Sequence, residues 1–185
     1  MSVTIHHGRI ETPAGRVEFL HRDGTLVEMG FERPGARRLE RLAKRFGRID
    51  VVEEKRPSAV SRAMRAYLKG DVHAIDSLPV QGDGTPFQEC VWAALRKIPA
   101  GRTMSYAAVA AKIGHPTAIR AVARANALNP VGIVVPCHRV IGSNGKLTGY
   151  AGGLNRKAWL LEHERKHAGL EESAGASPDL FAGLV

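Results

Sequence analysis

The chain has 185 residues, of which 44% are hydrophobic, enough for one sizeable core or two small ones, and this excludes a disordered protein. No window approaches about 18 uninterrupted apolar residues, and Met1 to His7 lack the pattern of a signal peptide, which predicts a soluble cytoplasmic protein that does not bind membranes. Cys90 and Cys137 are the only two cysteines and form no CxxC pair. A disulfide framework, a metal site and a cofactor are therefore not expected.

The formal net charge is +9, and its distribution is more informative than its total. Residues 1–80 carry 15 basic and 11 acidic side chains, whereas residues 90–161 contain no Asp or Glu. The basic side chains of this acid-free stretch are Arg96, Lys97, Arg102, Lys112, Arg120, Arg124, Arg139, Lys146, Arg156 and Lys157. The stretch favours a polyanionic partner, and nucleic acid fits best because phosphate contacts release counterions. The alternative is a basic surface that only contacts solvent.

The first part of the chain, residues 1–80, has the pattern of a small α/β domain. Apolar-rich runs at 16–20 and 25–31 surround Asp23-Gly24, which predicts a β-hairpin. One helix is predicted on the periodicity of Leu39, Leu42, Ala43 and Phe46, and a second over 58–69, each ended by a glycine. The histidines lack metal-ligand spacing and are interpreted as surface residues: His6, His7, His21 and His73.

A polar, glycine-rich joint at 81–84 is interpreted as a linker between two domains. Thr85, Pro86 and Gln88 then form a helix start, with Thr85 as the N-cap and Gln88 completing a capping box. The helix is predicted to continue to Ile98. Cys90 lies inside it without a His or acid partner in register, so we interpret Cys90 as a buried structural cysteine.

Two short helices follow, at 105–112 and 117–127, joined by a turn at 113–116, and Thr117 is expected to cap the second. Such a pair is typical of a helix-turn-helix, in which the second helix enters a DNA groove. That helix is rich in alanine, and Arg120 and Arg124 lie one turn apart on it. It is suited to close approach to DNA without sequence reading. A small helix packed in the core is the alternative.

Cys137 lies in the run Val134-Val135-Pro136-Cys137-His138-Arg139-Val140, directly after a predicted apolar strand. A thiol reacts as its thiolate, and a neighbouring His or Arg lowers the thiol pKa from roughly 8.5 toward neutrality. This placement predicts a nucleophile. A buried structural cysteine is the alternative.

From Thr85 to about Lys166 the chain resembles the O6-alkylguanine-DNA alkyltransferases, also called methylated-DNA–protein-cysteine methyltransferases. The resemblance is carried by Ser105-Tyr106, Arg120-Ala121-Val122, Asn129-Pro130, Pro136-Cys137-His138-Arg139-Val140, Gly149-Tyr150-Ala151-Gly152-Gly153-Leu154 and His163-Glu164. It implies an α/β (α+β) fold with a ribonuclease-H-like α/β domain at 1–80, a linker at 81–84 and a mostly helical, winged helix-turn-helix-like domain at 85–168. Residues 169–185 have the composition of a flexible tail.

The resemblance also implies DNA repair by direct reversal of damage, by a monomer that binds double-stranded DNA. The family's cysteine attacks the alkyl carbon of O6-alkylguanine, and of O4-alkylthymine, and leaves a stable thioether. A soft, partly desolvated thiolate suits that carbon. Because no neighbouring residue can hydrolyse a thioether, Cys137 is expected to react once per molecule.

His138 corresponds in this resemblance to the histidine that relays the thiol proton through a water, held by a glutamate that maps onto Glu164. Glu164 lies three and four residues after Leu161 and Leu160, on a face that a helix would bury, where a carboxylate needs a partner. His138 can be that partner. A surface position for Glu164 is the alternative.

The remaining roles follow from the resemblance residue by residue. Asn129 is similar to the asparagine that orders the turn near the cysteine, Tyr106 to the tyrosine that donates to the leaving guanine, and Arg120 to the arginine inserted in place of the flipped nucleotide. Further DNA contacts are assigned to Ala121, Arg124, Thr117 and Ser105. The base pocket is assigned to Val135, Pro136, Tyr150, Ala151, Gly152 and Gly153.

Two positions depart from some relatives. Ala151 stands where these carry a serine, so the pocket is expected to use backbone N–H groups instead of a hydroxyl. Gly132 replaces a proline, which predicts a wider pocket and an altered tolerance of bulky alkyl groups.

Three rival functions are open. A lesion-binding protein without transferase activity is disfavoured because such relatives lack the cysteine of this motif. A hydrolase that uses Cys137, His138 and Glu164 leaves the acid-free basic stretch unexplained. A DNA-binding regulator with a sensing thiol requires an operator sequence, which the alanine-rich helix does not predict.

Overall fold

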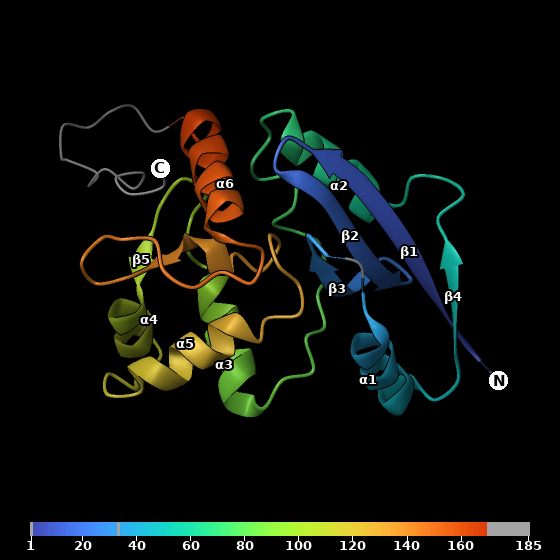
Figure 1. Ribbon diagram of the computed structural model, residues 1–185, viewed down its shortest axis with the longest axis horizontal. Coiled ribbons are helices and arrows are strands. Elements are labelled where there is room, and N and C mark those ends of the chain that lie inside the picture. Colours follow the sequence, from blue (N-terminus) through green and yellow to red (C-terminus); the bar gives the residue numbers. More distant parts are fainter. Residues whose placement is uncertain (1, 33, 170–185) are drawn as a thin grey trace.

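The computed structural model describes residues 2–32 and 34–169, and it is a mixed α/β structure (Figure 1). In the described part of the N-terminal half, residues 2–32 and 34–80, the elements are β1 (Val3–Thr12), β2 (Gly15–Arg22), β3 (Thr25–Gly30), α1 (Ala36–Phe46), β4 (Ile49–Glu53) and α2 (Ala59–Leu68). The strands form one sheet in the order β3-β2-β1-β4, in which only β4 pairs in parallel.

The predicted hairpin is confirmed as β2–β3, with Asp23-Gly24 at its turn. Both turn residues have positive φ, 49° and 83°, which the tight hairpin turn requires and which Gly and Asp tolerate better than most residues. The two predicted helices are confirmed as α1 and α2. The sequence interpretation missed β1 and β4, because β1 is interrupted by polar side chains and β4 is a largely exposed edge strand.

The interpretation of the N-terminal histidines as surface residues is wrong for His7 and His21, which are buried. Both ring nitrogens of His7 lie 2.8 Å from carboxylate oxygens, those of Glu18 and Glu53, and His21 Nε2 lies 2.8 Å from Glu54 Oε1. A buried imidazole is tolerated when its nitrogens have such partners. The other two histidines remain accessible.

The C-terminal half is mostly helical. Its elements are α3 (Pro86–Leu95), β5 (Met104–Ser105), α4 (Tyr106–Lys112), α5 (Ile119–Ala127), the 3₁₀ helix η1 (Cys137–Arg139), β6 (Val140–Ile141) and α6 (Leu154–His167). The predicted capping box of α3 is present, since Thr85 and Gln88 bond reciprocally. Cys90, however, is exposed on α3, so its interpretation as a buried structural cysteine is wrong. Helical residues need not face the core, and Val91 and Leu95 bury the opposite face.

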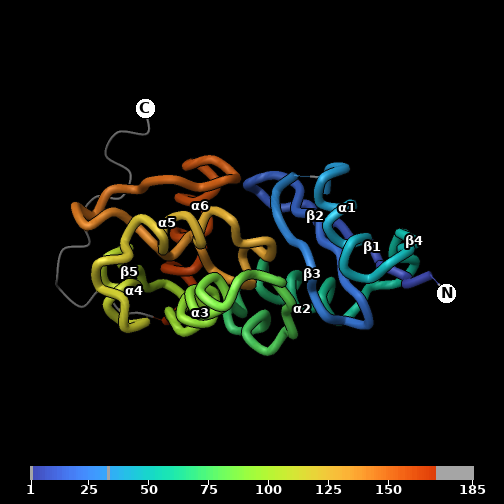
Figure 2. The backbone as a smooth tube through the Cα atoms, turned by 90° about the horizontal axis from the view of Figure 1, so that it is seen from below, coloured from blue at the N-terminus to red at the C-terminus, as the bar shows by residue number. Residues whose placement is uncertain are grey.

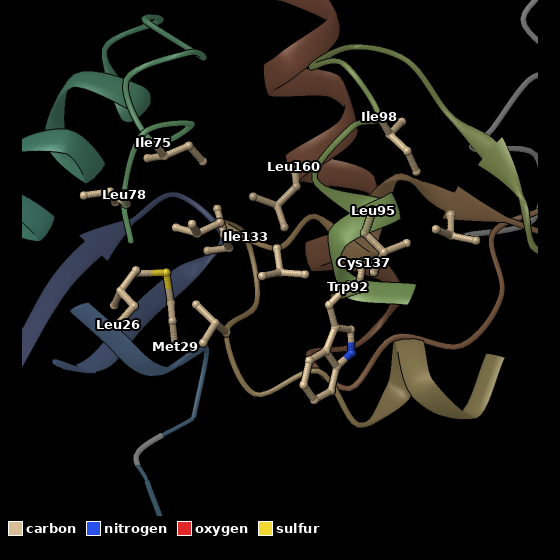
Figure 3. Close-up of a cluster of buried hydrophobic side chains, with 14 of the residues drawn as sticks. Leu26, Met29, Ile75, Leu78, Trp92, Leu95, Ile98, Ile133, Cys137 and Leu160 are labelled. Carbon is tan, nitrogen blue, oxygen red and sulfur yellow. The ribbon is translucent and has the colours of Figure 1, made fainter. Parts of the chain in front are cut away.

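One hydrophobic cluster spans the two halves, which Figure 2 shows side by side. Leu26 and Met29 of β3 pack in the same cluster as Trp92 and Leu95 of α3, and Cys137 lies among them (Figure 3). Backbone bonds from β3 also reach beyond the linker, as from Met29 N to Pro130 O at 2.8 Å. The boundary at 81–84 stays a prediction, and the shared core packs the N-terminal half against the segment that contains Cys137.

The predicted tail lies outside the described residues except for Gly169. Within residues 2–32 and 34–169, none of the helices combines the length and the apolar character needed to cross a membrane.

Candidate active site

Cys137 is the first residue of η1 and is 8% exposed. The strand predicted before it is wrong, because residues 131–135 form a turn in which Val135 N donates to Val131 O at 3.0 Å. Ile133 has φ of 70° in this turn, a conformation that is costly for a β-branched residue. Asn129 holds the turn by donating from Nδ2 to Val135 O at 2.8 Å and accepting at Oδ1 from Val131 N at 3.0 Å. The strained turn next to Cys137 is thus held by the side chain of Asn129 together with backbone hydrogen bonds.

Burial raises the pKa of the Cys137 thiol, which Asn129 and the charge of Lys157 only partly oppose. The expectation that His138 and Arg139 lower the thiol pKa toward neutrality is therefore wrong for this resting structure. The main physical reason is burial of the thiol, and in addition His138 Nε2 and Arg139 Nε and Nη2 bond to Glu164 instead of to the sulfur. The resting thiol needs a base to become a thiolate.

Glu164 is the centre of a buried polar cluster. Its side chain is 0% exposed, so a surface position for Glu164 is excluded. Its carboxylate accepts from His138 Nε2 at 2.9 Å, from Arg139 Nε and Nη2 at 2.8 Å each, from Tyr67 Oη at 3.0 Å and from Gly101 N at 3.2 Å. Burial alone raises the pKa of Glu164, but the charges and hydrogen bonds of His138 and Arg139 lower it well below its ordinary value. The predicted contact between His138 and Glu164 is confirmed.

His138 is 0% exposed and has one free acceptor position. Its Nε2 faces Glu164, whereas its Nδ1 is buried with no hydrogen-bond partner among the described residues. Burial lowers the pKa of His138, although Glu164 opposes this effect. A neutral imidazole that donates from Nε2 can accept a proton at Nδ1, which is the property of a general base.

Lys157 is a residue of the site that the sequence interpretation counted only as part of the basic stretch. It is 0% exposed, and its Nζ donates to Val140 O at 2.6 Å and to Thr148 O at 2.8 Å. Burial lowers its pKa to about 8, and the charge of Cys137 opposes that shift. The periodicity of α6 could have identified it, since Lys157, Leu160, Leu161 and Glu164 follow the i, i+3, i+4, i+7 pattern of one buried face.

Because Lys157 is buried, we expect the free energy of unfolding to rise with pH. Below about pH 8 both the folded and the unfolded protein hold the proton, and between about 8 and 10.4 the unfolded chain binds more protons, so the free energy of unfolding increases over that window. Relative to Lys157→Met, the gain is expected to reach about 3 kcal/mol as an upper bound. Urea unfolding between about pH 7 and 10.4 measures it, with the exposed Lys166→Met as control. If the difference in unfolding free energy between wild type and Lys157→Met does not change with pH over this range, the lowered pKa of Lys157 is contradicted.

A cavity of about 420 Å³ contains Cys137 in its wall. Five of the predicted functional residues line it together with Cys137: Tyr106, Asn129, Tyr150, Ala151 and Gly152. Gly132 also lines it. Val135 lines a separate cavity of about 150 Å³, and Pro136 and Gly153 line neither of these two cavities. The N-terminal half contributes residues that the sequence did not indicate, among them Met29, Phe31 and Arg38.

Two tyrosines in the cavity wall are suited to donate hydrogen bonds. Burial raises the pKa of Tyr106, and burial followed by the charge of Cys137 raises the pKa of Tyr150 well above its ordinary value. Both phenols therefore remain protonated at neutral pH.

The helix pair α4–α5 presents a basic face next to the cavity. Ser105 caps α4 by accepting from Ala108 N at 3.1 Å, but Thr117 does not cap α5, whose N-cap is Ala118. The exposed residues of α5 include Arg120, Ala121 and Arg124, while the opposite face buries Val122, Ala125 and Asn126. A helix packed entirely in the core is excluded. Ala123, Asn126 and Ala127 of α5 also line the cavity, so the helix that carries the basic face contributes to the same cavity wall as Cys137 of η1.

Comparison with known proteins gives a consistent result. The family model described as 6-O-methylguanine DNA methyltransferase, DNA binding domain, matches residues 86–166. A methylated-DNA–protein-cysteine methyltransferase of Methanosarcina barkeri is 40% identical over 164 residues, which span 88% of this chain and 99% of that protein. A protein of the same name from Shigella flexneri is 55% identical over 108 residues, 58% of this chain and 63% of the relative, which is less than two thirds of its length.

Solved structures resemble the whole fold. A crystal structure of Mycobacterium tuberculosis OGT in complex with DNA has 37% sequence identity and a TM-score of 0.70, and the match covers 88% of this chain and 94% of that one. The similarity therefore includes the N-terminal half as well as the residues around Cys137.

Proposed function

Because this chain belongs to the methylated-DNA–protein-cysteine methyltransferase family, we propose that it repairs duplex DNA by transferring the alkyl group of O6-alkylguanine, and of O4-alkylthymine, irreversibly to Cys137. The observation that carries the proposal is the position of Cys137, which lines the 420 Å³ cavity beside the basic helix α5 and adjoins the buried His138–Glu164 pair. Ligand pockets of about 300–1,000 Å³ are typical for small organic groups such as a base.

The reaction begins with removal of the thiol proton. A water between Cys137 and His138 passes this proton to Nδ1, and Glu164 stabilises the imidazolium that forms. The charge of Lys157 favours the thiolate in its buried position. The need for this relay follows from the raised thiol pKa, because a buried thiol does not ionise by itself at neutral pH.

In the transfer step the Cys137 sulfur forms a bond to the alkyl carbon while the bond between that carbon and O6 breaks. The electron pair of the broken bond stays with the guanine, which takes up one proton as the normal base is restored; this equals the one proton that the thiol lost to His138, so the reaction is balanced in protons. Tyr106 donates to the guanine ring during this step, and its raised pKa keeps that donor protonated. The product is a thioether, so each protein molecule reacts once.

DNA binding is assigned to the exposed face of α5. The flipped nucleotide leaves a gap in the duplex that Arg120 fills, and Ser105, Thr117, Ala121 and Arg124 contact the neighbouring backbone. Small side chains allow α5 to approach closely, and this supports binding that does not depend on sequence. Extruding a base costs on the order of a few kcal/mol, which the inserted arginine partly offsets.

The base pocket is assigned to Tyr150, Ala151 and Gly152, which line the cavity of Cys137, whereas Val135, Pro136 and Gly153 do not line it. Ala151 offers no hydroxyl, so recognition of the base rests on backbone N–H groups. Gly132 in the cavity wall leaves more room than a proline ring would, and this supports acceptance of larger alkyl groups.

We also propose the finer description of the architecture. The sheet order β3-β2-β1-β4 with a single parallel edge strand supports a ribonuclease-H-like domain at 1–80, and α4–α5 followed by the small β5–β6 pair supports a winged helix-turn-helix at 85–168. Two free cysteines support a reducing compartment. The protein is expected to act as a monomer.

The decisive test is intact-protein mass spectrometry after incubation with duplex DNA that contains one O6-methylguanine. One methyl group per protein molecule is expected, located at Cys137 by peptide mapping and absent from Cys137→Ala. The exposed Cys90→Ala is the matched control and is expected to react like the wild type. Retained lesion binding without any adduct would make this protein a lesion-recognition factor instead.

A further inference from the structure

One oxygen of Glu164 is shared by donors from distant parts of the chain. Oε1 accepts from His138 Nε2 at 2.9 Å and Arg139 Nη2 at 2.8 Å, both in η1. It also accepts from the hydroxyl of Tyr67 at 3.0 Å, although Tyr67 belongs to α2, 97 residues earlier. Both Tyr67 and Glu164 are 0% exposed, so bulk water does not compete for this bond.

The backbone of Tyr67 is also fixed to α6. His163 Nε2 lies 2.8 Å from the Tyr67 carbonyl oxygen, and the rings of the two residues are 5.0 Å apart. His163 directly precedes Glu164 in α6, so the two ends of Tyr67 contact successive residues of this helix. Val60 and Met64 of α2 are buried in the core that both halves share, which leaves the hydroxyl little freedom to move.

We propose that Tyr67 is a positioning residue for alkyl transfer, whose hydroxyl holds Glu164 Oε1 in place and, by sharing its negative charge, sets the basicity of His138. The inference rests on the function proposed above and deepens it. It assigns α2 of the N-terminal half a part in the chemistry.

The groups around His138 determine in which direction the Tyr67 hydroxyl changes the basicity of its imidazole. The groups that face His138 are Glu164 and Lys157 of α6, Arg139 and Cys137 of η1, and Tyr67 through the shared oxygen. A hydrogen-bond donor partly neutralises the negative charge of a carboxylate. Loss of the Tyr67 hydroxyl therefore strengthens the attraction between Glu164 and the imidazolium form of His138, which raises the pKa of His138. Because His138 must be neutral to accept a proton, the pH below which transfer slows then moves upward.

The test is Tyr67→Phe, which keeps the ring and removes the hydroxyl. The rate constant for methyl transfer from O6-methylguanine duplex is measured in single-turnover reactions from about pH 5 to 9. Loss of a hydrogen bond to a charged group is expected to lower the rate about tenfold at neutral pH. The acidic limb of the profile is expected to move up by about half a pH unit or more.

His163→Phe is the matched control, because it lies at the same interface, keeps an aromatic ring and removes the donor to the Tyr67 carbonyl without touching Glu164. It is expected to lower the unfolding midpoint and to leave the pH profile in place. The proposal is overturned if Tyr67→Phe reacts within twofold of the wild type with an unmoved profile. It is equally overturned if both variants lose rate by the same factor at every pH, which is the mark of a purely structural role.

An independent readout separates this inference from the proposed function. The titration of the His138 ring, followed by NMR in wild type and Tyr67→Phe, needs no DNA. A higher midpoint in the variant supports the inference, and an unchanged midpoint overturns it. A wild-type protein that transfers no methyl group would refute the function while the titration still decides the role of Tyr67.

Discussion

Replacing His138 by Gln is expected to slow alkyl transfer by about 100- to 10,000-fold while leaving binding to lesion-containing duplex unchanged. The glutamine amide can still donate to Glu164 Oε1, so the buried carboxylate keeps a partner, but an amide cannot accept the thiol proton. Single-turnover kinetics together with a DNA-binding titration measure the two effects separately.

The exposed His73→Gln serves as the control for this substitution, since it removes an imidazole far along the chain from Cys137. It is expected to react at the wild-type rate. A His138→Gln variant that reacts within about threefold of the wild type would exclude His138 as the base, and the raised pKa of Cys137 would then require another proton acceptor.

Glu164→Gln is expected to lower the free energy of unfolding at neutral pH by about 3–5 kcal/mol, because it leaves the buried guanidinium of Arg139 without its counter-charge. Urea unfolding measures the loss. The control is Glu162→Gln on the same helix, where the carboxylate is half-exposed and pairs with Arg165. This control is expected to change the stability by less than about 1 kcal/mol.

The loss of stability in Glu164→Gln is also expected to depend on pH. The pKa of Glu164 in the folded protein lies below its unfolded value of about 4.3, so its stabilisation is fully present above that value and is lost as the pH falls toward the folded pKa. The difference between wild type and Glu164→Gln is therefore expected to narrow below about pH 4. A difference that is small at neutral pH, or that widens in acid, would show that Glu164 does not compensate the charge of Arg139.

Local sequence patterns were sufficient where the physics is local. The hairpin at Asp23-Gly24 follows from backbone conformations that few residues tolerate, and the start of α3 follows from the reciprocal bonds of Thr85 and Gln88. The contact of His138 with Glu164 was also predicted, because a carboxylate on the buried face of a helix needs a partner.

Predictions failed where a distant part of the chain supplies the decisive contact. Cys90 and His7 illustrate this in opposite directions: the first is exposed because the core covers the other face of α3, and the second is buried because Glu18 and Glu53 reach its ring. The direction of the Cys137 pKa shift was missed for the same reason, since the thiol is buried by parts of the chain that are distant in sequence, and burial raises its pKa.

The sequence by itself determined the exposed basic helix and the family to which the chain is similar, and it predicted Cys137 as the nucleophile, because these are encoded in short motifs and in the acid-free stretch of residues 90–161. Only the tertiary structure decided that the thiol rests with a raised pKa, that Lys157 is buried, and that Tyr67 joins the cluster around Glu164. Burial and long-range hydrogen bonds set these properties, and neither depends on the residues adjacent in sequence.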